Sequence, residues 1–488
     1  MLFNSLHFLV FFPVVIGLYF ALPGRWRAPL LLVSSYYFYL SWKPAYGLLL
    51  AATTLLDYFS GVRMSRLASP AQRRPWLYLS LASNLGTLFI FKYFNFFTHT
   101  AVELAAALHV PFAAPTLALA LPVGVSFYTF QSVAYIVDVY QGKLAAEQHL
   151  GRFALFVAFW PQLVAGPIER GGQMLPQLQQ PHGFDYGRVA SGLRLMAWGM
   201  FKKVVIADRL ALLANPAFDH PQGFEGPALL VAVAAFTGQI YADFSGYTDL
   251  ARGAARVLGY NLVLNFRQPY LATSVGDFWR RWHMSLSSWF RDYVYIPLGG
   301  SRAGKVRTQL NVFIVFLLSG LWHGASWTFI LWGALHGTYL IAESLTAPSR
   351  AALAQRLRLP ARPGLQRLLS TGTTLALVAY AWIFFRANSL PDALYVAGHL
   401  FQGWGRLPTA QLTAALAGLG RHFGAELLVA AIAVALLALS DYRAERGSVA
   451  RWLAGWPVAG RWAGYAGLLL AILYFGVFGS SQFIYFQF

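Results

Sequence analysis

The stretch TQLNVFIVFLLSGLWHGASWTFILWGALHGTYLIA, residues 308–342, decides the fold class because it contains no Lys, Arg, Asp or Glu. A membrane-spanning helix needs about 20 mostly apolar residues. The stretch can therefore hold two such helices, or one helix and a re-entrant segment that is buried in protein. A histidine, His323, stands near the middle of this uncharged run.

Similar runs without charged side chains recur along the whole chain. They cover residues 1–24, 28–42, 75–91, 104–137, 153–168, 226–242, 368–385, 427–440 and 462–488. Together they predict an all-α, polytopic membrane protein with about eleven crossings, built as a single domain over residues 1–488. Pro and Gly interrupt several runs, as at 122–124 and 297–300. Broken helices at membrane depth need surrounding protein or an internal cavity, so we expect a cavity.

The composition agrees with this interpretation. Hydrophobic residues make up 57% of the chain and charged residues only 11%, whereas a soluble domain carries about 25% charged residues. The net charge of +19 comes from basic residues in short loops between apolar runs, as expected for cytoplasmic loops. We therefore expect the lipid bilayer as a partner, and no nucleic acid. Because the chain has no cysteine, it can form neither a thiol nucleophile nor a thiolate metal site.

The positions of the arginines predict the orientation in the membrane. They cluster after the first and third expected helices and before the last one: Arg25, Arg27, Arg63, Arg66, Arg73, Arg74, Arg443, Arg446, Arg451 and Arg461. If these loops are cytoplasmic, the N-terminus and the tail 483–488 both lie on the outer, periplasmic side. Residues 1–22 have neither a basic leader nor a small-residue cleavage site, which predicts a retained first helix.

The densest polar region is DFWRRWHMSLSSWFRD, residues 277–292, followed closely by further basic residues. One interpretation is an amphipathic helix in the membrane interface, with arginines that reach toward water. The other is a cytoplasm-facing site in which arginine forks grip the phosphates of an anionic ligand. Its basic residues are Arg280, Arg281, Arg291, Arg302 and Lys305, and the turn at Gly299-Gly300 could bring backbone amides close to the same ligand.

The motif SGLWHGASW, residues 319–327, contains the most informative histidine. A histidine at membrane depth is costly to bury unless it is partnered, so His323 either forms a structural hydrogen bond between helices or serves a function. In a dry cavity, desolvation keeps an imidazole neutral, and a neutral imidazole can accept a proton from a hydroxyl. His336 is a weaker copy of this pattern, and we interpret it as structural.

Other catalytic patterns find little support in the sequence. There is no Gly-x-Ser-x-Gly motif and no nearby Asp–His–Ser pattern, which leaves a hydrolase triad unsupported. No histidine pair has the i, i+4 spacing of a helical zinc site, and we expect no metal. Asp243 and Asp249 follow the apolar run 226–242 and precede two arginines, which predicts ion pairs at the end of a helix.

The motifs quoted so far occur together in one known family. DFWRRWH (277–283), LGG (298–300), GLWHG (320–324) and the final FIYFQF (483–488) resemble the membrane-bound O-acyltransferases, and among them the bacterial alginate O-acetylase branch. Further matching pieces are LPVGVSFYTF (121–130), AGPI (165–168), DFSGYTD (243–249) and NFRQPY (265–270). The resemblance runs along the whole chain, although residues 345–460 are only weakly diagnostic.

The resemblance implies a specific architecture and site. The fold would be a ring of transmembrane helices around a thin centre, with a tunnel from a cytoplasmic donor site to the outer face. The essential histidine would be His323, and the family's second polar position falls on His283. The donor would be acetyl-CoA, and a periplasmic SGNH-type acetyltransferase would receive the acetyl group. The terminal aromatic motif is implicated in that transfer, which makes Tyr485 a candidate acyl relay.

The resulting prediction is a membrane-bound O-acetyltransferase of the bacterial inner membrane that serves O-acetylation of an exopolysaccharide such as alginate or cellulose. His323 would act as general base and His283 would assist it, while the basic residues of 280–305 hold acetyl-CoA. Two alternatives stay open: the same chemistry on peptidoglycan, and a non-enzymatic transporter or flippase of an acyl or glycan precursor. Broken helices and a central cavity suit the transporter as well.

Overall fold

The computed structural model describes residues 1–164, 166–224, 226–302, 304–404, 423–447, 449–478 and 483–484. Every regular element of these residues is a helix, which confirms the predicted all-α polytopic class. The chain divides into two compact units. Unit 1 comprises Met1–Met196 and Tyr247–Val263, and unit 2 comprises Ala197–Gly246 and Leu264–Phe488.

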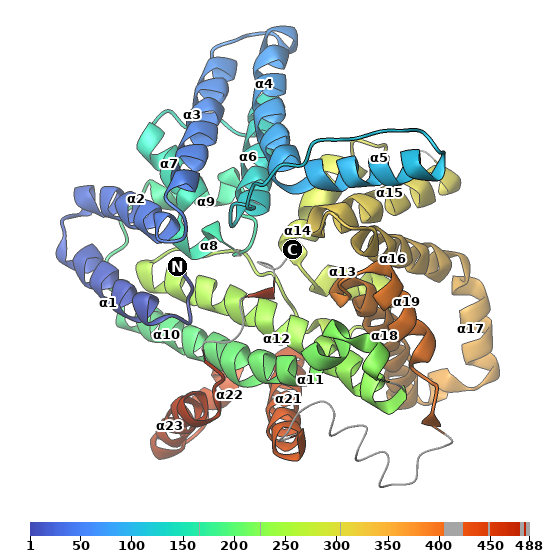
Figure 1. Cartoon of the computed structure of the whole chain (residues 1–488). Coiled ribbons are helices and arrows are strands. Elements are labelled where there is room, and N and C mark those ends of the chain that lie inside the picture. The colour runs from blue at the N-terminus through green and yellow to red at the C-terminus, as the bar shows by residue number, and fades with distance from the viewer. Residues whose placement is uncertain are drawn as a thin grey trace. The chain divides into compact units, whose positions relative to one another are not determined.

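Unit 1 is built mainly from the N-terminal helices (Figure 1). They are α1 (Leu6–Ala21), α2 (Gly24–Leu40), α3 (Ala45–Ser65), α4 (Pro70–Leu88), the π-helical η1 (Phe89–Tyr93), α5 (Phe94–Ala107), α6 (Val125–Tyr140), α7 (Leu150–Ala158), α8 (Trp160–Leu163) and α9 (Gly171–Leu178). Figure 1 shows α3, α4 and α6 side by side, and these three helices contact one another. Two helices, α10 (Tyr186–Met200) and α12 (Gly226–Leu258), contribute residues to both units.

A buried carboxylate links α3 to α4 within unit 1. Asp57 accepts hydrogen bonds from the Ser80 hydroxyl at 2.5 Å and from the Asn84 amide at 2.8 Å. All three side chains are buried. Because a buried polar group is costly unless it is hydrogen-bonded, this cluster favours one register between the two helices.

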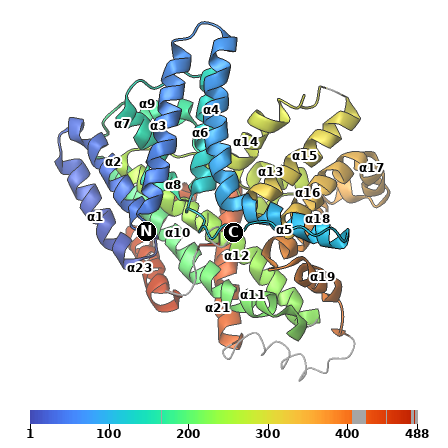
Figure 2. The same ribbon diagram turned by 45° about the horizontal axis from the view of Figure 1, so that its top comes forward.

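Unit 2 holds most of the remaining elements. They are η2 (Phe201–Ala207, π-helical), α11 (Asp208–Asp219), η3 (Pro221–Gly223), η4 (Pro269–Leu271), α13 (Val275–Arg281), α14 (Met284–Phe290), η5 (Arg291–Tyr295, π-helical), α15 (Lys305–His323), α16 (Trp327–Leu345), α17 (Ala347–Arg356), η6 (Leu359–Ala361), α18 (Pro363–Arg386), α19 (Leu390–His399), α21 (Phe423–Arg446), α22 (Val449–Ala454) and α23 (Val458–Phe475). Figure 2 shows α15 and α16 side by side, and α16 also contacts α18.

The stretch 308–342 forms two helices, α15 and α16, which is the first of the two arrangements that the sequence leaves open. Small residues let the two helices approach closely. A Cβ atom on Gly320 would collide with the Phe329 carbonyl, and one on Gly333 would collide with the Phe316 carbonyl. Glycine at these two positions therefore determines how α16 lies against the end of α15 that carries His323.

Among the described residues, five helices are long and apolar enough to cross a membrane by length and composition: Ala45–Ser65, Gly226–Leu258, Pro363–Arg386, Gly424–Arg446 and Val458–Phe475. The charge-free runs predict more crossings because they also count apolar residues that lie in shorter elements. The run 153–168, for example, is divided between α7 and α8, and α1 has only 16 residues. The expectation that Asp243 closes a helix is wrong, because α12 continues to Leu258.

Candidate active site

His283 lies at a sharp break between two short helices. The Ser274 hydroxyl caps α13 by accepting the Asp277 backbone N–H at 3.0 Å, and α13 ends at Arg281. His283 then adopts φ 44° and ψ 51°, in the left-handed region, before α14 begins at Met284. A non-glycine residue pays about 1–2 kcal/mol for this conformation. The amphipathic stretch 277–292 is therefore not one interfacial helix, and the break turns the imidazole into the protein interior, where it is fully buried.

Asn265 determines which nitrogen of His283 carries the proton. The Oδ1 atom of Asn265 accepts the backbone N–H of Ser285 at 3.1 Å, so this atom is the amide oxygen. The Nδ1 atom of His283 lies 3.2 Å from the same oxygen and must act as the donor. In a neutral imidazole the other nitrogen then has no proton. The Nε2 atom of His283 is therefore a proton acceptor.

His323 is the last residue of α15 and is only 4% exposed. Aromatic rings from two other helices surround it: Trp332 of α16 at 5.0 Å and Phe385 of α18 at 5.2 Å between ring centroids. Gly324 follows, and a Cβ atom there would collide with the ring of Phe329. The glycines of the GLWHG motif thus let the surrounding helices close around the histidine.

The structure brings the two predicted catalytic histidines together within unit 2. The centroids of the His283 and His323 rings are 6.2 Å apart, with an angle of 61° between the ring planes. At this separation the ring nitrogens lie beyond the limit of about 3.5 Å for a direct hydrogen bond. The pair can instead act on a common group, such as a hydroxyl that binds between the rings.

Burial affects the charge of His283. This residue lies outside the five long apolar helices, and desolvation lowers its pKa from the usual 6.5 to about 3. The imidazole is therefore neutral at physiological pH. A neutral imidazole with Nδ1 bonded to an amide oxygen can orient a substrate hydroxyl or accept its proton.

His336 lies on α16 and is fully buried, but its surroundings differ. Its Nδ1 atom accepts a hydrogen bond of 3.2 Å from the indole N–H of Trp279. The bond joins α16 to α13, which carries Trp279. This arrangement is the structural hydrogen bond between helices that the sequence predicts for His336.

The basic residues predicted to bind a donor occupy different environments. Arg281 is only 12% exposed and forms a two-pronged ion pair with Glu445, at 2.8 and 3.1 Å, together with a contact of 3.0 Å to Asp277. Arg280 and Arg291 are exposed, by 72% and 63% of their side chains, and each also contacts a neighbouring aspartate. Exposed Arg302 and Lys305 flank the start of α15. Four of the five are thus accessible from solvent.

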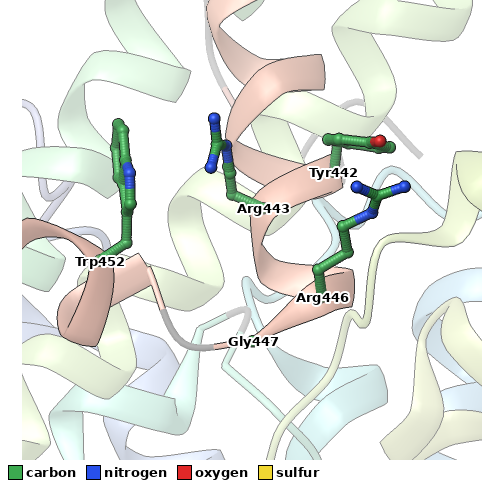
Figure 3. A pocket seen from close by; sticks show the side chains of 5 residues that line it. All are labelled: Tyr442, Arg443, Arg446, Gly447 and Trp452. Atoms are coloured by element: carbon green, nitrogen blue, oxygen red, sulfur yellow. The ribbon is translucent and has the colours of Figure 1, made fainter.

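A basic hollow of about 440 Å³ opens where α21 meets α22 (Figure 3). The guanidinium of Arg443 lies 5.1 Å above the ring of Trp452, and that of Arg446 lies 4.2 Å above the ring of Tyr442. From the sequence, Arg443 and Arg446 are interpreted only as markers of membrane orientation, and it is not foreseen that both line one hollow. Their spacing of one helical turn was the available signal.

Three further findings complete the site. Tyr485 lies outside the described residues. Among the residues that are described, no group of three or more His, Asp or Glu side chains could hold a metal ion. The role of Asn265 is not predicted from the sequence. The available signal is its place in the motif NFRQPY, which is one of the motifs that carry the family resemblance.

The chain is similar to known proteins over most of its length. The sequence profile of the membrane-bound O-acyltransferase family matches residues 147–382, which include both histidines. The protein named "Probable alginate O-acetylase AlgI" in Azotobacter vinelandii is 39% identical over 453 residues, covering 91% of this chain and 86% of the relative. The protein of the same name in Pseudomonas aeruginosa is 41% identical over 83% of this chain and 76% of the relative.

A third relative differs in the acceptor that its name states. The "Peptidoglycan O-acetyltransferase" of Helicobacter pylori is 36% identical, over 81% of this chain and 79% of the relative. All three names describe acyl transfer to an oxygen, which rules against the non-enzymatic transporter that the sequence left open. By these likenesses the chain is a membrane O-acyltransferase, and it belongs to the membrane-bound O-acyltransferase family.

Proposed function

We propose that this enzyme transfers acetyl groups from acetyl-CoA to a hydroxyl group, for O-acetylation of an exopolysaccharide. The observation that carries the proposal is the buried pair of His283 and His323, whose rings are 6.2 Å apart. Such a pair suits a reaction in which a hydroxyl must lose its proton in a dry environment.

In the proposed reaction, His323 accepts the proton of the acceptor hydroxyl while the hydroxyl oxygen attacks the thioester carbonyl. A carbon–oxygen bond forms, the carbon–sulfur bond breaks, and the CoA sulfur leaves and takes up the proton. Before the reaction, the Nε2 atom of His283 accepts the hydrogen bond of this hydroxyl and orients it; the hydroxyl then turns its single proton to His323 as the oxygen attacks. Because Asn265 holds the His283 tautomer, this nitrogen is ready for the task before substrate binds.

The exposed basic residues of unit 2 indicate where the acetyl-CoA donor binds. CoA carries several phosphate charges, and arginine is suited to bind phosphate in a two-pronged manner. Exposed Arg280, Arg291, Arg302 and Lys305 are available for this contact. Arg281 is bonded to Glu445 and Asp277, so its contribution is to hold α13 in place and to add positive potential beside the phosphates.

The cellular arrangement is part of the same proposal. The enzyme lies in the bacterial inner membrane with both termini on the periplasmic side, binds acetyl-CoA from the cytoplasm and passes acetyl groups to a periplasmic SGNH-type acetyltransferase. The names of the relatives support a glycan as the final acceptor, since they mention alginate and peptidoglycan. We propose an alginate-like polymer or cellulose, with peptidoglycan as the alternative. Tyr485 would relay the acetyl group to the partner.

The test uses the purified enzyme in nanodiscs with acetyl-CoA carrying a labelled acetyl group, the candidate partner and the glycan. The expected result is release of free CoA together with an alkali-labile acetyl ester on the glycan. His336→Gln serves as a control for a change at another buried histidine and is expected to retain this reaction. No release of CoA and no ester, with the enzyme and the partner both folded, would refute the proposal.

The relay is tested separately by Tyr485→Phe, which removes the hydroxyl that would carry the acetyl group. Acetylation of the partner should stop, while the affinity for acetyl-CoA, measured by calorimetry, stays unchanged. Normal acetylation of the partner by this variant would remove Tyr485 from the mechanism.

A further inference from the structure

Unit 2 contains a buried ionic cluster that the proposed reaction does not use. The ammonium group of Lys203, on the π-helical η2, lies 2.8 Å from Asp208 and 2.7 Å from Asp243. The three side chains are only 3–4% exposed. One ammonium faces two carboxylates here, and a buried carboxylate needs hydrogen-bond donors as well as a counter-charge.

The C-terminal segment supplies such a donor. The backbone N–H of Ile484 donates to Oδ2 of Asp243 at 2.8 Å. The ring of Phe483 lies 5.8 Å from the ring of Phe244, the next residue on α12. The side chains of Phe483 and Ile484 are 1% and 2% exposed. These two residues are therefore inserted into unit 2 rather than lying on its surface.

The chain that leads to this segment is held by the same elements. After α23, the backbone N–H of Val477 donates to the carbonyl of Val204 on η2 at 2.9 Å. The guanidinium of Arg209, at the start of α11, donates to the carbonyl of Phe475 at 2.6 Å. Contacts at Phe475, Val477 and Ile484 thus follow one another along the chain.

The docked segment lies beside the histidine pair. Phe244 contacts Phe483 and also packs edge-on against His283, with ring centroids 4.7 Å apart. Two consecutive residues of α12 therefore contact the C-terminal segment. Asp243 binds its backbone, and Phe244 contacts both this segment and His283.

We propose that Asp243, paired with Lys203, is a positioning residue that docks the C-terminal segment at Phe483–Ile484 beside the histidine pair. Its contribution to acetyl transfer rests on the proposed function, whereas the docking itself does not. Because Asp243 binds a backbone N–H, docking tolerates a change of the Ile484 side chain but depends on the carboxylate.

The absence of cysteine from the chain allows a direct test. Ile484→Cys places a single thiol at a position that is 2% exposed and keeps the backbone N–H. In the otherwise unchanged protein, a maleimide reagent should label this thiol at least about tenfold more slowly than in the detergent-denatured chain, because a buried thiol reacts only after local opening. Adding Asp243→Ala should raise the rate by about tenfold.

Asp208→Asn is the matched control. Asp243→Ala and Asp208→Asn each remove one carboxylate charge from beside Lys203 and leave the other in place. The lysine keeps an ion-pair partner in both variants, so both are expected to fold. Of these two aspartates, Asp243 is the one that accepts the hydrogen bond from the Ile484 backbone N–H. We therefore expect the thiol to stay protected in Asp208→Asn. Unchanged protection in Asp243→Ala, or equal exposure in the two variants, would overturn the proposal.

If Asp243→Ala elutes as an aggregate, Asp243→Asn replaces it. The amide keeps an oxygen acceptor but loses the charge, so the labelling rate should fall between those of the parent and the alanine variant. If Asp243→Asn were labelled at the same rate as the parent, docking would not require the negative charge of Asp243.

The activity assay separates docking from chemistry. If the proposed function also holds, Asp243→Ala lowers kcat by about tenfold and leaves the KM for acetyl-CoA unchanged. Labelling needs no acetyl-CoA. Protection of the parent thiol and exposure in Asp243→Ala, with no acetyl-CoA cleavage by either protein, would therefore support docking and refute the proposed function. A parallel loss in kcat and rise in KM would contradict a positioning role.

Discussion

Two of the buried polar clusters in the described part of this apolar chain are built differently. In unit 1, Asp57 takes its hydrogen bonds from Ser80 and Asn84, on the next helix along the chain. In unit 2, His283 and His323 come from two separate breaks in the helical structure, after α13 and at the end of α15. The first cluster surrounds its carboxylate with hydrogen-bond donors, whereas the second places an acceptor nitrogen in the interior, which is the arrangement that proton transfer needs.

The largest effect should come from the second cluster. His323→Ala removes the proposed general base, and such groups typically contribute about 10²–10⁴-fold to the rate. We expect kcat for acetyl transfer to fall by that factor. Steady-state kinetics of protein that elutes as a single species, like the parent, would measure it. Full activity in this variant would mean that the two clusters do not differ in function.

A smaller loss is expected when the orientation of His283 is disturbed. Asn265→Ala removes the oxygen that accepts from Nδ1 of His283 and from the Ser285 backbone. The imidazole can then adopt the other tautomer, and we expect kcat to fall by about 10–100-fold. Asn265→Asp, which retains the acceptor, should recover part of the rate. An equal loss in both variants would indicate a role of Asn265 in folding only.

The first cluster should respond in stability rather than in rate. Asp57→Ala leaves the buried groups of Ser80 and Asn84 without this acceptor, which costs about 1–3 kcal/mol of folding free energy. We expect a lower midpoint of thermal unfolding in detergent and an unchanged kcat per folded molecule. If Asp57→Ala unfolded at the same temperature as the parent but had a much lower kcat, the first cluster would serve catalysis rather than stability, which would contradict the account.

The smallest effect concerns pH. The pKa of His283 is about 3 in the folded protein and about 6.5 in an unfolded chain. Between these values the unfolded chain binds a proton that the folded protein does not, so folding stability decreases as pH falls from 7 to 5. His283→Gln lacks this group, and its unfolding midpoint should therefore fall less over that range. Equal pH dependence in both proteins would contradict the burial of a neutral His283.

Much of this architecture follows from the sequence alone. The absence of charge over residues 308–342 predicts two helices or one helix with a re-entrant segment, and the structure has two helices, the first of which ends at the central histidine. The GLWHG glycines also have a physical reason that can be anticipated, since small residues allow close helix contact. The pattern of apolar and charged residues therefore predicts those parts of the structure that depend on residues close together in the sequence.

Contacts between distant segments could not be predicted in this way. Nothing in the sequence pairs Asn265 with His283, or Asp243 with the backbone of Ile484, because a hydrogen bond to a backbone group leaves no signal in residue type. The number of crossings was uncertain for a similar reason: an uncharged run such as 153–168 does not show where its helix breaks. Residue type alone does not distinguish Lys203 from the other basic residues, although it is buried between two carboxylates.

The central claim is that His283 and His323 act as one unit on the same hydroxyl. A double-mutant cycle of kcat for acetyl transfer, with His283→Gln, His323→Ala and the double variant, tests this claim directly. Residues that act as a unit are strongly non-additive, so the double variant should be no slower than His323→Ala alone. If the two losses instead multiply, the histidines act independently, and the pair does not form a single catalytic unit.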